Sequence, residues 1–461
     1  MQTQEVDKLL DGDFRYKSFT VNNFEKIPQV IEHLTPEEIE EIKIVSSVLP
    51  FKANNYVVDE LINWHNFRND PIFNLTFPNK QMLKSRHYKL ISDLYKRSAG
   101  KEQIEDAAIK IRHELNPHPA GQSKYNVPLH KGKPVEGIQH KYDHTVLFFP
   151  RQGQTCHAYC TFCFRWPQFV KTKDLKFATK DIDNVLEYIR NHNDISDILF
   201  TGGDPMVMAG KVIDQYITKI INAKIPHLKN IRFGSKSLAY WPYTFTNKNG
   251  EIILGAFKKL IDNGYHVALM AHFNHYKELN TVAVKKSIEL IRSCGVVIRA
   301  QSPVIRNIND NYEIWAKMWT KEVELGIIPY YMFIIRDTGA QHYFNISLIK
   351  AWEIFRDAYQ NVTGLARTVR GPSMSCEPGK IHILGVSEIK GEKVIVLRFL
   401  QGRNSDWIHK PFFAKYNPNA SWIDELEPAF DEERFFYQDE LEEIYDIKEM
   451  KYLKIEQISK N

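Results

Sequence analysis

The sequence predicts an α/β fold built on a parallel sheet, with a helical region before it and an extension after it. From residue 146 onward, short apolar runs alternate with amphipathic stretches of helical length, which is the pattern of strand–helix units in series. Before residue 116 the pattern is mainly helical, and after residue 369 two apolar runs flank a tight turn. Periodicity does not choose between an open sheet and a full or partial barrel, but both place their chemistry at the carboxyl ends of the strands.

Length and composition narrow the class of protein. The 461 residues correspond to roughly three units at about 150 residues per domain. Lys and Arg exceed Asp and Glu by 5, too small an excess to indicate a nucleic-acid-binding protein. The first residues contain no signal-peptide core, and no apolar run approaches the ~20 residues of a membrane span. An odd number of cysteines, 5, does not form a secreted disulfide framework, so we expect a cytoplasmic protein.

Residues 1–115 are predicted to form an N-terminal helical region. Thr35 and Pro36, followed by two glutamates, are typical of a helix start, because the hydroxyl caps the first turn and acids suit the positive end of the helix dipole. A second amphipathic helix is expected over residues 102–115. Residues 116–141 are rich in Pro and Gly, which predicts a long ordered loop or linker and a domain boundary.

Residues 142–365 are predicted to form the core. The expected strands are Val146–Phe149, Ile198–Phe200, Ile231–Phe233, His266–Ala271, Val296–Ala300 and Tyr330–Ile335. The expected helices are Lys180–Arg190, Val212–Ile221, Glu251–Asp262, Val282–Arg292, Tyr312–Leu325 and Ser347–Tyr359. In the first of them, Ile182, Val185, Leu186 and Ile189 share one face, as an amphipathic helix requires.

Residues 366–461 are predicted to form a C-terminal hairpin and extension. The runs Ile381–Val386 and Lys393–Leu400 flank Lys390-Gly391-Glu392, a sequence typical of a hairpin turn. The tail that follows is acidic and aromatic, which predicts a solvated or capping segment.

Three cysteines follow the first predicted strand. Cys156, Cys160 and Cys163 have the spacing C-x3-C-x2-C, and thiolates this close can share one soft metal centre. A structural zinc site would need a fourth ligand, and His157 is expected to point away because it adjoins a cysteine in a tight loop. A four-iron cluster on three cysteines keeps one iron open for a substrate or cofactor. A zinc or electron-transfer protein is the alternative.

A glycine pair follows the second predicted strand. Gly202, Gly203 and Asp204 come directly after Thr201, and glycines at a strand end let the backbone approach a ligand closely. The aspartate can meet a ligand ammonium group. The other interpretation is a plain strand-to-helix turn.

These two motifs resemble the radical S-adenosylmethionine (SAM) superfamily, in which an aromatic residue precedes the third cysteine, as Phe162 does here. From about His140 to Phe399 the chain further resembles the lysine 2,3-aminomutases. The resemblance implies a partial (β/α)6 TIM-like barrel that carries a [4Fe-4S] cluster. It also implies that SAM contacts Phe162, Gly202, Gly203, Asp204, Ser235, His272 and Gln301.

The same resemblance implies pyridoxal phosphate (PLP) on Lys380, which lies in Pro378-Gly379-Lys380-Ile381 where the family has a Gly-rich turn. That lysine must be neutral to form an imine. Arg165 corresponds to a family arginine that faces an anion. Asp337 and Glu377 are the candidates to bind the far amine of a substrate. The chain departs from the family where Thr145 replaces an arginine, where the turn is shorter, and where an acid near Cys376 is missing.

The implied function is generation of a 5′-deoxyadenosyl radical for a PLP-dependent amino-acid 2,3-aminomutase, an isomerase. The alternatives are a radical SAM enzyme without PLP that acts on another metabolite or a peptide, and a non-catalytic iron–sulfur protein. The implied partners are a small amino acid, an electron donor such as flavodoxin or ferredoxin, and further copies in a homo-oligomer. No nucleic acid or membrane is expected.

Overall fold

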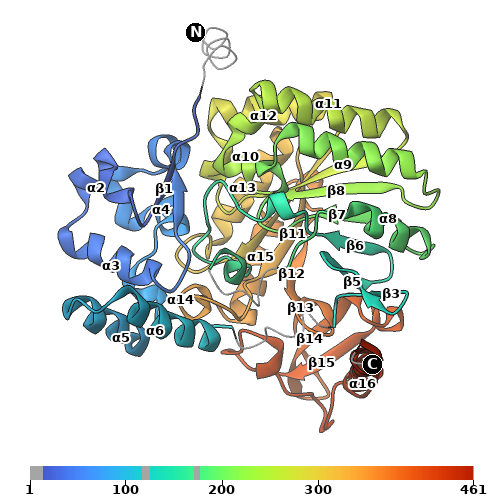
Figure 1. The fold of residues 1–461 in the computed structure, drawn as a ribbon. Helices are drawn as coiled ribbons and strands as arrows, with labels where there is room; N and C mark the ends of the chain where they lie inside the picture. Colours follow the sequence, from blue (N-terminus) through green and yellow to red (C-terminus); the bar gives the residue numbers. More distant parts are fainter. Residues whose placement is uncertain (1–13, 117–124, 171–176, 460–461) are drawn as a thin grey trace.

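The computed structural model describes residues 14–116, 125–170 and 177–459 (Figure 1). Its centre is an eleven-stranded sheet with the order β15-β14-β13-β12-β11-β10-β9-β8-β7-β6-β5. From β6 to β12 each strand runs parallel to its neighbours, as helical crossovers require. β5 joins one edge antiparallel, and β13 to β15 continue the other edge antiparallel. The predicted α/β class with a parallel sheet is confirmed.

The strands of this sheet are β5 (Ile138–Tyr142), β6 (Thr145–Phe148), β7 (Asp197–Phe200), β8 (Asn230–Ser235), β9 (His266–His272), β10 (Val297–Val304), β11 (Ile328–Ile334), β12 (Arg370–Ser375), β13 (Gly379–Ile389), β14 (Glu392–Gly402) and β15 (Pro411–Lys415). The crossing helices are α8 (Ile182–Arg190), α9 (Gly210–Ala223), α11 (Lys248–Asp262), α12 (Val282–Ser293), α13 (Tyr312–Glu324) and α15 (Leu348–Gln360), with the short α10 (Ser237–Tyr240) and α14 (Gln341–Phe344) between them. Every predicted core strand and helix overlaps one of these elements. The predicted apolar face of α8 is buried.

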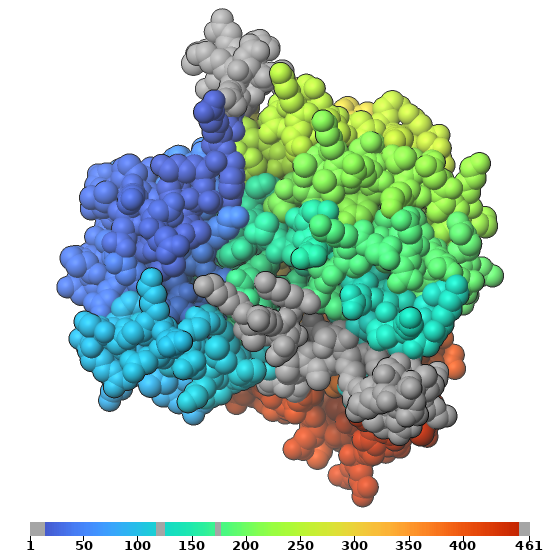
Figure 2. Space-filling model, viewed as in Figure 1, coloured from blue at the N-terminus to red at the C-terminus, as the bar shows by residue number. Residues whose placement is uncertain are grey.

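The N-terminal region packs on one side of the sheet domain and is blue in Figures 1 and 2. It contains α2 (Pro28–His33), α3 (Pro36–Ser46), α4 (Pro71–Thr76), α5 (Ser85–Lys96) and α6 (Lys101–Glu114). The predicted start of α3 is confirmed, since Thr35 and Glu38 form a reciprocal capping box. A small sheet of β1 (Ser18–Thr20) and β2 (Lys52–Asn54) was not predicted, because strands of three residues are too short to show alternation.

The segment predicted as a loop or linker, residues 116–141, contains strands in its second half. Residues 117–124 lie outside the described chain, but β3 (Leu129–His130) and β4 (Lys133–Pro134) form a two-stranded ladder. β5 then pairs with β6 across a tight turn, so the predicted boundary at 141/142 falls inside a hairpin. In the described half of this segment, Gly132 and Gly137 have positive φ, as turns between short strands require. The pairing of β5 with β6 supplies backbone hydrogen bonds that periodicity does not reveal.

The predicted boundary at 365/366 does not end the sheet either, because β12 is parallel to β11 and continues it. The predicted hairpin is confirmed as β13 and β14. Lys390 and Gly391 both have positive φ, as a two-residue hairpin turn requires. The acidic tail ends in α16 (Gln438–Ser459), which packs on the segment after the hairpin: Glu440 accepts hydrogen bonds from the side chains of Trp407 and Asn404. In the part of the chain that the structure describes, no helix has the length and apolarity to cross a bilayer.

Candidate active site

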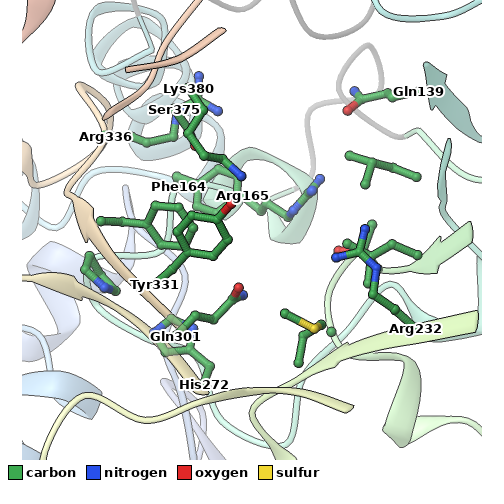
Figure 3. A pocket seen from close by; sticks show the side chains of 18 of the residues that line it. Gln139, Phe164, Arg165, Arg232, His272, Gln301, Tyr331, Arg336, Ser375 and Lys380 are labelled. Atoms are coloured by element: carbon green, nitrogen blue, oxygen red, sulfur yellow. The ribbon is translucent and has the colours of Figure 1, made fainter. Parts of the chain in front are cut away.

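A cavity of about 1090 Å³ lies within the parallel strands. Side chains from every strand between β6 and β13 line it, together with the loop that carries the three cysteines. Figure 3 shows Gln301 beside His272 at one end, and Lys380 near Tyr331 and Arg336 at the other. The cysteine loop and the segments 202–204 and 235–236 lie at the carboxyl ends of β6, β7 and β8, where the topology of a parallel sheet places chemistry.

The three cysteines all line this cavity. Burial raises the pKa of each thiol, that of Cys163 to about 12, and the Cys160 thiol raises the pKa of both Cys156 and Cys163 further. Thiolates here therefore need a compensating positive group, which fits a metal cluster that binds them ionised. Within the described ranges, no three His, Cys, Asp or Glu side chains are grouped so that they could hold a metal ion.

His157 is not placed to act as a fourth ligand. Its Nδ1 lies 3.0 Å from Ser237 Oγ, and its Nε2 lies 3.4 Å from Thr244 Oγ1. The ring also stacks on Trp241. Burial lowers the pKa of His157 to about 3, so the imidazole is neutral. Its contacts with Ser237, Thr244 and Trp241 hold the cysteine loop in place.

The N-terminal region anchors the cysteine loop from outside. Lys52 Nζ donates to the carbonyl oxygen of Cys156 at 2.8 Å, and Tyr16 Oη donates to that of His157 at 2.6 Å. Asn54 Nδ2 donates to the carbonyls of His157 and Tyr240 at 3.2 and 2.9 Å. Sequence reasoning missed these residues, because they lie 103 to 141 positions before the cysteine-loop residues that they contact.

The glycine pair allows the cysteine loop to approach β7. A Cβ on Gly202, whose φ is +132°, would lie 2.2 Å from Gln154 Nε2. A Cβ on Gly203 would lie 2.4 Å from the carbonyl oxygen of Thr155. The close neighbour in the structure is thus the start of the cysteine loop, so these glycines fix its position beside the cavity.

Asp204 is buried and accepts four hydrogen bonds. Its Oδ1 accepts from Met206 N at 2.9 Å. Its Oδ2 accepts from Ser235 Oγ, Lys236 N and Ser237 Oγ at 3.0, 2.9 and 3.1 Å. The carboxylate therefore orders the end of β8, including the predicted SAM contact Ser235. Direct contact of Asp204 with SAM stays a prediction.

The other predicted SAM contacts come together. His272 and Gln301 are register partners on β9 and β10, and the Phe162 ring lies 5.9 Å from the His272 ring. Burial holds the pKa of His272 well below its usual range, so its imidazole is neutral. His272 Nε2 lies 3.1 Å from Asn274 Nδ2. These groups form a polar wall with an aromatic side next to the cysteine loop.

A buried ion pair behind this wall was not predicted. Lys236 Nζ donates to Glu278 Oε1 at 2.7 Å and to Asn274 Oδ1 at 2.9 Å. It also lies 4.4 Å from the centre of the Tyr240 ring. The hydroxyl of Tyr240 is 3.6 Å from Cys160 Sγ. The sequence contained one sign of this ion pair, since Lys236 directly follows the predicted SAM contact Ser235.

Lys380 extends from β13 into the cavity. Its Nζ donates to Gln401 Oε1 at 2.9 Å and lies 4.3 Å from the centre of the Tyr331 ring. Burial lowers the pKa of Lys380 to about 8. A neutral amine is thus accessible near neutral pH, which is the property that imine chemistry requires. The residues present fit PLP in this respect.

The three predicted anion and substrate residues have different environments. Arg165 lines the cavity with its guanidinium 4.7 Å from the Phe149 ring centre and 5.0 Å from that of Phe164. Asp337 is half-buried at the cavity wall beside Arg336. Glu377 is exposed, beside Tyr445 of α16, so it lies at the rim rather than inside. Their contacts with a substrate stay predictions.

The cavity wall also contains an ion pair between Arg232 and Asp197 that sequence reasoning missed. Arg232 on β8 makes two hydrogen bonds to Asp197 on β7, and Thr145 Oγ1 donates to the same carboxylate at 2.8 Å. Thr145 stands where the resemblance implies an arginine, and Arg232, two strands away on β8, binds the same carboxylate as Thr145. The residues are not close in sequence and meet only through strand register.

Comparison with known proteins identifies the family. The chain is 30% identical over 395 residues to a protein of Aquifex aeolicus (strain VF5) named "Putative L-lysine 2,3-aminomutase", covering 86% of this chain and 92% of the relative. The chain belongs to the lysine 2,3-aminomutase family of radical SAM enzymes. The L-lysine 2,3-aminomutase of Clostridium subterminale is 28% identical over 57% of the chain, and that of Methanococcus maripaludis is 26% identical over 64%. The matches span 60% and 65% of those two relatives.

No family model matches the chain. Among solved structures, SuiB of Streptococcus suis bound to S-adenosylmethionine aligns over 64% of each chain with 12% identity and a TM-score of 0.34. The predicted family is confirmed by the relatives. Family members are isomerases that use a [4Fe-4S] cluster, SAM and PLP.

Proposed function

We propose that this chain is a radical SAM aminomutase that binds PLP on Lys380 and moves an amino group within a small α-amino acid. The observation that carries the proposal is one cavity lined both by the three cysteines of one loop and by a lysine amine whose pKa burial lowers to about 8. Membership of the aminomutase family supports the same conclusion. Neither a zinc protein nor a simple electron carrier needs that amine.

The first part of the proposal concerns the cluster and SAM. Cys156, Cys160 and Cys163 would bind the cluster, and Lys52 and Asn54 would hold their loop in place. SAM would lie against the wall described above. Gly202 and Gly203 would keep that wall close to the cluster, and Asp204 would orient the Ser235 hydroxyl.

The second part concerns PLP and the amino acid. Lys380 would attach PLP, and its hydrogen bond to Gln401 would aim the amine into the cavity. Arg165 would bind a carboxylate or phosphate through its planar guanidinium. When bound, the cluster with SAM supplies the radical that abstracts hydrogen, and PLP carries the migrating amino group. The protein orients these groups and excludes water.

The finer architecture follows from the same proposal. We propose that β6 to β11 with their helices form a partial (β/α)6 barrel over residues 142–365, preceded by residues 1–115 and followed by residues 366–461. β5, from the predicted linker, and β12 extend the barrel strands on either side. The reaction would draw on an electron donor such as flavodoxin or ferredoxin, which suits a reducing cytoplasm, and the enzyme would form homo-oligomers.

The test begins with the purified chain under anaerobic conditions, reconstituted with iron and sulfide. We expect reductive SAM cleavage, and its loss in Cys156→Ala, Cys160→Ala and Cys163→Ala. PLP is then added, followed by borohydride and peptide mapping. A pyridoxyl group on Lys380 supports the proposal. SAM cleavage without any adduct would favour a radical SAM enzyme that lacks PLP, and absence of both would favour a non-catalytic protein.

A further inference from the structure

The hydroxyl of Tyr240 lies beside one of the three cysteines. Its oxygen is 3.6 Å from Cys160 Sγ, a hydrogen-bonding distance for sulfur. The residue is 1% exposed, so the hydroxyl has no access to bulk water, and a buried tyrosine hydroxyl ordinarily finds a partner inside the protein. Among the described residues, the Cys160 sulfur is the one hydrogen-bond partner of this hydroxyl.

Tyr240 is held in this position by its neighbours. It ends α10, and its N–H donates to the carbonyl oxygen of Lys236 at 2.9 Å. Its own carbonyl oxygen accepts from Asn54 Nδ2 at 2.9 Å. Lys236 Nζ, which is paired with Glu278 at 2.7 Å, lies 4.4 Å from the centre of the Tyr240 ring. The phenol is therefore oriented toward Cys160 by contacts that involve no bound group.

The protons available set the direction of this hydrogen bond when Cys160 binds iron. A thiol can donate to the phenol oxygen, but a thiolate that binds a metal has no proton and can only accept. A phenol keeps its proton at neutral pH, so Tyr240 Oη would donate to the sulfur. Among the described residues, Cys160 is also the one of the three cysteines whose sulfur has a side-chain hydrogen-bond partner.

Such a hydrogen bond favours the reduced form of an iron–sulfur cluster. Reduction by one electron adds one negative charge to the cluster and its thiolates, and a donor to a ligating sulfur stabilises that charge. The effect is strong here because the hydroxyl is buried. The adjacent pair of Lys236 and Glu278 carries no net charge in sum, which leaves the phenol as the neutral donor closest to the sulfur.

We propose that Tyr240 is a positioning residue that donates a hydrogen bond to the ligating Cys160 sulfur and thereby makes the cluster easier to reduce. The inference rests on the proposed function, since it requires the cluster on the three cysteines. In the step concerned, one electron from the external donor converts the 2+ cluster to the 1+ state, and no proton is transferred. Tyr240 raises the share of reduced cluster at a given potential of the electron donor.

A redox titration of the anaerobically reconstituted protein, followed by electron paramagnetic resonance without SAM, tests the proposal. Tyr240→Phe removes only the hydroxyl. At equal iron and sulfide content, we expect the equilibrium constant for one-electron reduction to fall about tenfold, which is a midpoint about 59 mV more negative. Tyr243→Phe is the matched control, because this buried tyrosine donates to Glu60 at 2.6 Å instead of a sulfur. An unchanged midpoint in Tyr240→Phe, or an equal shift in both variants, overturns the proposal.

A second replacement decides the matter if Tyr240→Phe takes up less iron. Replacement of Tyr240 by 3-fluorotyrosine keeps the shape of the ring and makes its hydroxyl a stronger donor. The midpoint should then become more positive, opposite in direction to the effect of Tyr240→Phe. A residue that only packs against the loop would leave the midpoint unchanged in this protein, and that result overturns the proposal.

Failure of this inference differs from failure of the proposed function. A cluster that forms, cleaves SAM and has the same midpoint in every variant would overturn only the role of Tyr240. A wild-type chain that takes up no four-iron cluster would overturn the proposed function, and this inference with it.

Discussion

The regions before and after the parallel sheet both support the site, but in different ways. The N-terminal region touches the cysteine loop from outside, through Lys52 and Asn54, which bind its backbone carbonyls. The C-terminal region extends the sheet itself, and β13 places Lys380 inside the cavity. One region therefore positions a loop, and the other supplies a reactive group. Changes in the first should act on cluster assembly, and changes in the second on chemistry at the lysine.

The largest expected effect comes from Lys380→Ala. Because the amine is the only atom group proposed to attach PLP covalently, the variant should lose the borohydride-stable adduct and at least about 1000-fold of aminomutase activity. Iron content and SAM cleavage should remain. Lys390→Ala, in the exposed turn of the same hairpin, is the control. An adduct that persists in Lys380→Ala would show that the C-terminal region does not supply the amine that attaches PLP.

The next effect is the pH dependence of PLP attachment. The folded-state pKa of Lys380 is lowered to about 8 from 10.5, so the neutral amine dominates above that value and declines below it. The rate of attachment should rise about tenfold per pH unit below 8 and level off above it. Rapid mixing with PLP between pH 6 and 10 measures this. A rate still rising at pH 10 would mean that burial does not lower the pKa.

Asn54→Ala tests the N-terminal region. The side chain is fully buried, and its loss leaves the carbonyls of His157 and Tyr240 and the amide of Val57 without this partner. We expect a loss of about 2–4 kcal/mol of stability and lower iron content after reconstitution. PLP attachment to Lys380 should be less affected than iron content. Asn55→Ala, which contacts residues 15 and 17 instead, should keep its iron. Equal loss of iron in Asn54→Ala and Asn55→Ala would contradict a specific role of Asn54 in holding the cysteine loop.

Glu440→Ala should have the smallest effect. It removes the acceptor that ties α16 to Trp407 and Asn404, which is expected to cost about 1 kcal/mol. Thermal unfolding should shift slightly, and SAM cleavage should not change. Glu443→Ala, on an exposed position of the same helix, serves as its control. A large loss of SAM cleavage would show that the C-terminal helix also supports the cluster end.

The sequence by itself determined the order of strands and helices, because each core element carries its own periodicity, as α8 and β13–β14 do. It also identified Cys156, Cys160 and Cys163, whose spacing is local. It could not show that β5 leaves the Pro-rich segment to join the sheet, since pairing depends on a partner strand. Nor could it show that Asp204 orders Ser235, or that Asn54 holds the cysteine loop. Those contacts join residues 31 and 103 positions apart, and the pKa of Lys380 depends on burial. Only the tertiary structure decides them, because distance, burial and charge are set by how the chain packs.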